Sequence, residues 1–436
     1  MRARACFMLV DAASSGGDMA EAWARLAQAA ELPLDALGLA ELASLRAWCH
    51  ALDGQLERAG VQMREFVAHA EAHPERVCPL IAGRVHPLLM GVPAVPEVFE
   101  RFAVAARHAA PAQPAPWQLT TLVIEGWVHF WRGDRAATQA VLDRAEALYQ
   151  QFGAIRLLAQ RLDQLRVLHA AALGRDEDAL QLARRQTEAL QAPELERHRA
   201  VWTRAYQHGY ARLLWMAGRD HAFLAAVPAL TAPRRAGEHG FVDVAADVVR
   251  GQAALIEGRP RAALEPLGRA CEAYARYRLP TVFCDPRISL AQAWLALRDR
   301  RRAWQAFEPL YRELAPRSDV GPLLLDSRRV VAAVLEALPA DVGTTPETQR
   351  MRERLEDWAR PAEREASKAS GPLARLSERE REVLAAVAEG AGNKHIARAL
   401  DLSLHTVKRH IANILDKLDC ASRGQAAEIY RRTQAH

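Results

Sequence analysis

Apolar residues recur along most of the chain at the spacing of one face of an α-helix. Within 130–149, for example, one side of a helix collects Leu142, Ala145, Leu148 and Tyr149. One helical segment follows another in this way up to about residue 360. The pattern therefore predicts an all-α fold.

Similar turn sequences separate these helices at intervals of 37 to 44 residues. The expected turns lie at Gly54, Gly91, Gly133, Gly174, Gly218 and Gly258 and, without a glycine, at Arg298. Glycine closes a helix because it adopts the left-handed conformation freely, and Asp or Arg beside it can open the next helix. One helix pair cannot bury its apolar face alone, so the pairs are predicted to stack into an α-solenoid.

These units resemble tetratricopeptide repeats, although they are longer than the usual ~34 residues. They also resemble the looser repeats in the sensor region of large bacterial transcription activators of the maltose-regulator type. The resemblance implies that residues 1–360 form a sensor or interaction region, whose concave surface binds a small-molecule inducer or a protein. A helical array without any ligand stays open as the alternative. The many tryptophans here are expected to lie mostly in the core.

The composition of the sequence changes after the repeats. The stretch "EASKASGP" has the small, polar composition of a flexible connector, and Pro361 follows a charged helical segment. A linker over 361–375 is therefore expected, with a separate domain over 376–436.

Four short helices are expected in this final domain. The first starts at Ser377 and stops at Gly390, and Asn393 is the expected N-cap of the second. Ser403 is placed to cap the third helix, and the fourth opens at Ser422. The third carries one buried stripe at i, i+4, i+7 and i+11, made of Val407, Ile411, Ile414 and Leu418.

The second and third helices meet at a short turn and pack on the first, which is the arrangement of a helix-turn-helix. Such units place their second helix in the major groove of DNA. Here the outward face, opposite the apolar stripe, holds Thr406, Lys408, Arg409, Ala412 and Asn413. Lysine and arginine can reach phosphates or guanine edges, so this face is a candidate DNA-reading surface.

Spaced motifs in the same domain sharpen this prediction. "REREVL", the glycine before "NKHIA", "TVKRH", "KL" and the segment 423–426 follow one another in order. Together they resemble the LuxR-type DNA-binding domain of bacterial transcription regulators almost from end to end. The resemblance covers about a seventh of the chain.

The LuxR resemblance implies DNA contacts centred on the segment 393–412. The implied contact residues are Asn393, Lys394, Ser403, Thr406, Val407, Lys408, Arg409, His410, Ala412, Asn413 and Lys417, although the apolar spacing also places Val407 in the core. Lys417 can equally be a solvated cation at the end of its helix. The fourth helix would supply the dimer contact through Ala426, Ala427 and Tyr430.

Three positions depart from the family's pattern. Ala412 is short where a longer polar side chain is common, which would weaken the readout of one base. His395 replaces the usual acidic residue, and Gly392 replaces a small hydroxyl residue. These departures bear on the fine detail of the DNA contacts.

Composition and charge agree with this picture. The chain has a net charge of +5, and residues 371–436 hold 11 Lys and Arg against 8 Asp and Glu. The sequence has no G-x-x-x-x-G-K-[ST] loop, no strand–helix alternation of a receiver domain and no G-x-S-x-G elbow. An enzyme is therefore not expected, and neither a cofactor nor a metal site is predicted.

The six cysteines form no C-x-x-C pair, which is typical of isolated thiols in a reducing compartment. Asp11 ends the first apolar run too early for a signal peptide, and no run reaches the roughly 18 apolar residues of a membrane helix. A cytoplasmic protein is expected.

The sequence as a whole predicts a bacterial transcription regulator that binds a two-fold DNA operator as a homodimer. The repeats would control the C-terminal domain through an unknown inducer or protein, and RNA polymerase would be a partner if the protein activates transcription. The alternative is a repeat scaffold for protein–protein assembly, with a C-terminal docking module that does not read DNA.

Overall fold

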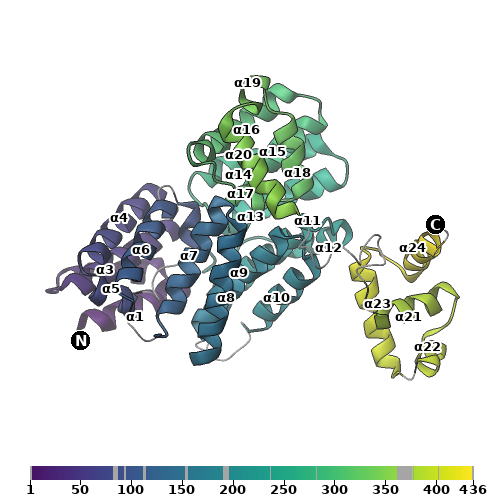
Figure 1. Cartoon of the computed structure of the whole chain (residues 1–436), viewed down its shortest axis with the longest axis horizontal. Coiled ribbons are helices and arrows are strands. Elements are labelled where there is room, and N and C mark those ends of the chain that lie inside the picture. Colours follow the sequence, from purple (N-terminus) through teal and green to yellow (C-terminus); the bar gives the residue numbers. More distant parts are fainter. Residues whose placement is uncertain are drawn as a thin grey trace. The chain divides into compact units, whose positions relative to one another are not determined.

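The computed structural model describes residues 2–81, 87–92, 95–110, 114–152, 156–189, 196–235, 237–280, 282–360, 376, 378–400 and 402–434. These residues form helices joined by turns, with no strand among them, which confirms the all-α prediction (Figure 1). They divide into two compact units, residues 1–217 with 227–359 and residues 218–226 with 360–436. The expected linker 361–375 and the expected cap Ser377 lie outside the described residues.

The repeat helices come first along the chain. Their bounds are α1 Arg2–Ser15, α2 Met19–Ala30, α3 Ala36–Leu52, α4 Leu56–Ala72, α5 Pro74–Ile81, η2 Pro87–Gly91, α6 Val95–His108, α7 Gln118–Arg132, α8 Arg135–Phe152, α9 Arg156–Ala172, α10 Asp176–Ala189, α11 Glu196–Met216, α12 Asp220–Leu230, α13 Phe241–Ile256, α14 Pro260–Tyr274, α15 Pro286–Ala296, α16 Arg300–Leu314, η4 Ala315–Arg317, α17 Gly321–Leu324, α18 Arg328–Glu336, α19 Ala340–Gly343 and α20 Pro346–Ala359. The C-terminal helices are α21 Glu378–Ala388, α22 Asn393–Ala399, α23 Leu404–Lys417 and α24 Arg423–Gln434. Within the helices that the structure describes, none is long and apolar enough to cross a membrane.

All but one of the predicted turns have the left-handed backbone conformation that glycine adopts freely. Left-handed backbone, with φ between 62° and 77°, occurs at Gly54, Gly133, Gly174, Gly218, Gly258 and Arg298. Gly91 was wrongly expected to behave in the same way. It ends the 3₁₀ helix η2, and a Cβ there would lie 2.3 Å from the carbonyl oxygen of Arg278. Close packing is therefore the reason for glycine at this position.

Aspartate side chains begin several of the repeat helices. The Asp134 carboxylate accepts a hydrogen bond from the Ala137 amide at 2.9 Å, directly after the Gly133 turn. Asp299 does the same for Arg302 at 2.9 Å, after the turn at Arg298. Each carboxylate satisfies an amide that the first turn of the helix leaves unpaired. At both turns the left-handed residue ends one helix, and the aspartate directly after it starts the next.

Small residues bring the paired helices close together. A Cβ at Gly251 of α13 would lie 2.3 Å from Leu267 of α14, so a larger residue could not be accommodated without separating the two helices. Ala263 and Leu267 are fully buried against Ala254 in the same cluster. The pair therefore depends on a glycine within a helix, where its conformational freedom would otherwise be a cost.

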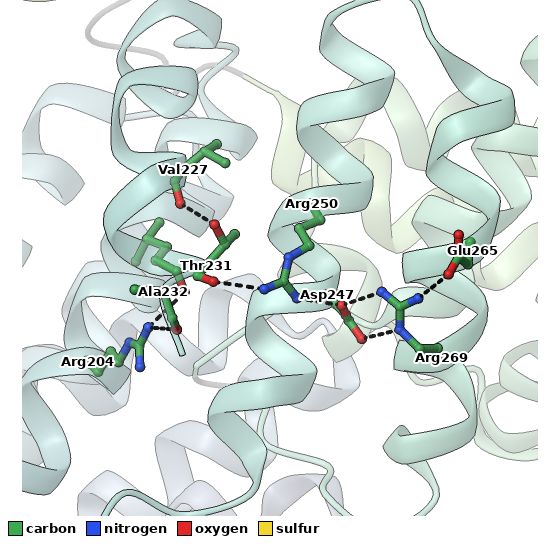
Figure 2. A network of polar contacts seen from close by, with 9 residues as sticks. Arg204, Val227, Thr231, Ala232, Asp247, Arg250, Glu265 and Arg269 are labelled. Atoms are coloured by element: carbon green, nitrogen blue, oxygen red, sulfur yellow. Dashed lines mark hydrogen bonds and ion pairs between the residues drawn. The ribbon is translucent and has the colours of Figure 1, made fainter. Parts of the chain in front are cut away.

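A polar network links this pair to the segment that follows α12 (Figure 2). Asp247 of α13 accepts from Arg250 at 2.7 Å and from Arg269 of α14 at 2.9 Å, and Arg269 also pairs with the exposed Glu265. Arg250 in turn donates to the carbonyl oxygen of Thr231 at 2.8 Å. These contacts hold the outer surfaces of the helices in register around the apolar core.

Asp326, just before α18, is a carboxyl with no exposed surface. Its Oδ1 accepts from the Trp215 indole N–H at 2.7 Å and from the Ser327 amide at 2.6 Å. Burial raises the pKa of Asp326 to about 7, and the Trp215 hydrogen bond only partly offsets this. The folded protein thus retains a proton that the unfolded chain loses near pH 4.

This difference predicts a pH-dependent effect of Asp326→Asn. Because the folded state binds the proton more tightly, the wild-type free energy of unfolding falls as the pH rises from about 4 to about 7 through this group. The variant lacks this pH-dependent loss. From about pH 5 to about pH 7.5, its free energy of unfolding should therefore rise by about 2 kcal/mol relative to that of the wild type. Urea denaturation at the two pH values measures this. An exposed control, Asp341→Asn, should show no such gain, and parallel pH curves for Asp326→Asn would contradict the assignment.

Candidate functional site

The C-terminal helices pack around one small apolar core. It contains the stripe predicted for the third helix, and its buried members are Leu376, Val383, Leu384, Val387, Ile396, Val407, Ile414, Leu418, Cys420, Ala426 and Ala427. Ile411 and Leu400 are partly buried against it. The apolar stripes of α22 and α23 thus face α21 and each other, which is the predicted helix-turn-helix packing.

The starts of these helices agree with the sequence in part. Ser403 is the N-cap of α23, as expected, because its hydroxyl accepts from the Thr406 amide at 3.0 Å. Asn393 was wrongly expected to cap α22. Gly392 is the N-cap there, and the Asn393 side-chain oxygen instead accepts from Arg423 at 3.3 Å. Asn393 is therefore engaged with the start of α24.

The outer face of α23 is open to solvent where the sequence predicted a reading surface. Lys408, Arg409 and Ala412 are exposed, and Thr406 and Asn413 are partly exposed. The Thr406 hydroxyl lies 2.7 Å from that of Ser403, so these two groups form a small polar cluster at the helix start. The arrangement presents two flexible cations beside short polar groups along one helix face.

The cations of this domain fall into two groups. Those on α21, α24 and the end of α23 contact carboxylates or carbonyl oxygens, namely Arg379, Arg381, Lys417, Arg423, Arg431 and Arg432. Those that contact no described residue in this way are Lys394, Arg398, Lys408 and Arg409, all exposed and all on α22 or α23. The free positive charge of the described domain is therefore confined to its helix-turn-helix.

Arg398 is a member of this second group that sequence reasoning missed. It lies four residues after Lys394 on α22, so the two side chains share a helix face. The basic spacing itself was visible in the sequence. That neither cation has a carboxylate partner is visible only in the structure.

Two of the predicted contact residues lie in different surroundings from those expected. Val407 has no exposed surface and packs in the core, so it cannot reach DNA. Lys417 donates to Glu380 Oε2 at 2.7 Å, and the Glu380 side chain is only 5% exposed. The cation at the end of α23 thus neutralises a buried carboxylate of α21, and neither of the two readings of Lys417 anticipated this role.

The fourth helix also differs from expectation. Ala426 and Ala427 are buried inside the domain's own core, and Tyr430 is partly buried against it. Small buried residues cannot contact a second subunit while they pack on α21. A dimer contact through α24 would instead use residues on its exposed side.

His410 completes the description of the predicted residues. It is partly buried, and its Nδ1 atom is enclosed without a hydrogen-bond partner. In the described part of the chain, no group of three His, Cys, Asp or Glu side chains is placed to hold a metal ion. The chemistry of this domain is therefore that of positive charge, hydroxyls and amides on a helix surface.

Comparison with known proteins identifies this domain. Residues 374–430 match the family of bacterial regulatory proteins named after luxR. The chain is 48% identical over 61 residues to the transcriptional regulatory protein LiaR of Bacillus subtilis, covering 14% of this chain and 29% of that protein. It is 47% identical over 51 residues to the response regulator protein VraR of Staphylococcus aureus, covering 12% and 24%.

A longer match reaches beyond this domain. The chain is 31% identical over 156 residues to the monoamine regulon transcriptional regulator of Klebsiella aerogenes, covering 36% of this chain and 66% of that protein. A match of this length must include residues outside 374–430. The chain thus spans less than two thirds of each of these relatives. Residues 374–430, at the C-terminal end of the described chain, thus match the luxR family of bacterial regulatory proteins.

Proposed function

We propose that this protein is a bacterial transcription regulator that binds a DNA operator as a homodimer through its C-terminal helix-turn-helix. The observation that carries the proposal is that, in the described part of the C-terminal domain, the free cations are confined to α22 and α23. Lys394 and Arg398 would bind the phosphate backbone, while Lys408 and Arg409 would face the bases. Asn393, Ser403, Thr406, His410, Ala412 and Asn413 would line the same surface.

The domain division of the proposal places the sensor region at 1–360, the linker at 361–375 and the DNA-binding domain at 376–436. A ligand of the repeats would shift the balance between a held and a free DNA-binding domain. By linkage, that ligand must bind better when the domain is free if it promotes DNA binding. The protein would act in the bacterial cytoplasm, and RNA polymerase would be its partner at activated promoters.

The salt dependence of binding separates this proposal from the scaffold alternative. Contacts to about six phosphates predict a slope near −5 for the logarithm of the association constant against the logarithm of salt concentration. Fluorescence anisotropy of a labelled operator duplex measures this slope. A slope near zero, with retained binding to a protein partner, would favour a docking module instead.

A further inference from the structure

The repeat unit contains a cavity of about 520 Å³ near the end of its helical array. Five chain segments line it: the α9–α10 turn, the end of α11, α17, residues 326–336 and the last part of α20. Its wall is largely apolar, with Met216, Leu323, Leu335, Leu355 and Trp358 among the lining residues. This size and lining suit a small organic molecule.

The charged groups of the wall are mainly acidic. The lining holds four carboxyl side chains, Asp176, Asp326, Glu336 and Glu356, and two guanidinium groups. Glu336 and Glu356 are exposed at their helix surfaces, and neither forms a hydrogen bond or ion pair with a described residue. Two negative charges at the wall are thus available to a ligand.

The two arginines of the wall are already engaged. Arg328 donates to the carbonyl oxygens of Ala172 and Trp358, and Arg352 donates to that of Leu335 at 2.7 Å. The buried Arg352 Nε–H lacks an acceptor. One Nη of each guanidinium group is thus committed to a backbone carbonyl, which leaves only part of the group for a bound anion, whereas Glu336 and Glu356 are both free to pair with a cation.

Asp326 supplies an independent observation. Its Oδ1 has two hydrogen-bond donors, but its Oδ2 is buried without any partner among the described residues. When Asp326 is ionised, this buried oxygen lacks a donor, and a ligand N–H would take the place of the proton that the group otherwise retains. The wall thus holds an unsatisfied acceptor in addition to its two free carboxylates.

We propose that this cavity binds a small organic amine whose ammonium group pairs with Glu336, Glu356 and Asp326 while its apolar body packs on Leu355 and Trp358. Glu336 and Asp326 belong to the α18 region, whereas Glu356 belongs to α20, so a bound amine fastens α20 to the rest of the unit. Helix α20 ends at Ala359, immediately before the segment that leads along the chain to the DNA-binding domain. Occupancy of the cavity would therefore reach that domain through α20, a step that rests on the proposed function.

Titration calorimetry with three compounds of similar size tests the charge preference. Phenethylamine is cationic at neutral pH, phenethyl alcohol is neutral and phenylacetate is anionic. We expect the amine to bind the full-length protein at least about tenfold more tightly than the other two, a difference of ~1.4 kcal/mol. Equal or tighter binding of the alcohol or the acid, or no binding of the amine up to about 10 mM, would overturn the proposal.

Matched variants locate the site. Glu336→Gln/Glu356→Gln removes two exposed charges and should weaken amine binding about tenfold or more. The control, Glu353→Gln/Asp341→Asn, removes two exposed carboxylates outside the cavity lining and should bind the amine as wild type does. Ala332→Trp places a bulky group on an exposed lining position and should exclude the amine. Unchanged affinity in both cavity variants would place the amine elsewhere.

Coupling to DNA is measured separately, so the two proposals can fail independently. Saturating phenethylamine should change the operator affinity of the wild type and leave that of Glu336→Gln/Glu356→Gln unchanged. An amine that binds the cavity without changing operator affinity would overturn the coupling through α20. A protein that binds the amine as expected but binds no DNA at all would instead contradict the proposed function.

Discussion

Replacing Lys408 and Arg409 with alanine is expected to weaken operator binding by about a hundredfold or more. Both side chains are exposed on the outer face of α23, and neither forms a hydrogen bond or ion pair with a described residue, so both cations are available to DNA. Loss of a base-reading or phosphate-binding cation costs about 1–3 kcal/mol, and two such losses together give about 3–4 kcal/mol. Anisotropy of a labelled operator duplex at fixed salt measures the change.

A matched control separates this effect from a general loss of positive charge. Arg300 and Arg301 are adjacent, exposed and without a described partner at the start of α16 in the repeat unit. Arg300→Ala/Arg301→Ala removes the same net charge and should leave operator affinity within about twofold of wild type. Equal weakening in both double variants would show that α23 has no special part in binding. Circular dichroism of each variant confirms that the helices are retained.

Glu238→Ala is expected to be the most destabilising of the substitutions considered for the repeat unit. Glu238 accepts from Arg204 at 2.9 Å, and the two side chains are only 3% and 7% exposed. It also accepts from the Arg235 amide at 2.7 Å. Removing the carboxylate leaves a buried guanidinium without its counter-charge, which typically costs about 3–5 kcal/mol.

Urea denaturation followed by circular dichroism measures this loss. Glu265→Ala is the control, because Glu265 also pairs with an arginine, Arg269, but its side chain is 85% exposed. An exposed pair contributes about 0–1 kcal/mol, so this variant should unfold almost as wild type does. Similar losses in the two variants would mean that burial does not determine the contribution of these ion pairs. Figure 2 shows both Arg204 and the Arg269–Glu265 contact.

The sequence predicted the repeat architecture well because the residues that end each helix lie within the turn itself. Six of the seven expected turns have left-handed backbone, including Arg298, where no glycine marks the turn. A further turn of the same kind was missed. Gly17 has φ of 81° between α1 and α2, and it lies 37 residues before Gly54, within the spacing of the other turns. Gly91 could not be predicted, because its neighbour Arg278 is distant in sequence.

The C-terminal domain shows what apolar spacing and family resemblance can each provide. The i, i+4, i+7 stripe correctly placed Val407 and Ile414 in the core, whereas the resemblance alone assigned Val407 to DNA. Ala426 and Ala427 are small, so their sequence cannot distinguish a subunit contact from a tight contact with α21. Side-chain pairing between helices determines which cations are free, and it also determines that Lys417 neutralises Glu380. Such pairing leaves no periodic signal.

The cavity of the repeat unit could not be foreseen either. Its walls come from the α9–α10 turn and from α18 and α20, which lie more than a hundred residues apart along the chain. Glu336 and Glu356 are exposed on helices, where an acidic residue is ordinary, and the burial of Asp326 leaves no signal in the sequence. Only their convergence around an apolar space, with Asp326 Oδ2 lacking a donor, indicates a binding site.

Selection of duplexes from a genomic fragment library tests the central claim most directly. The full-length protein, its Lys408→Ala/Arg409→Ala variant and the isolated residues 370–436 are compared. We expect the wild type, or the isolated domain if the repeats are inhibitory, to enrich a two-fold symmetric site that the double variant does not enrich. If neither the full chain nor the isolated domain enriches any site, the helix-turn-helix does not read DNA and the scaffold alternative is the better account.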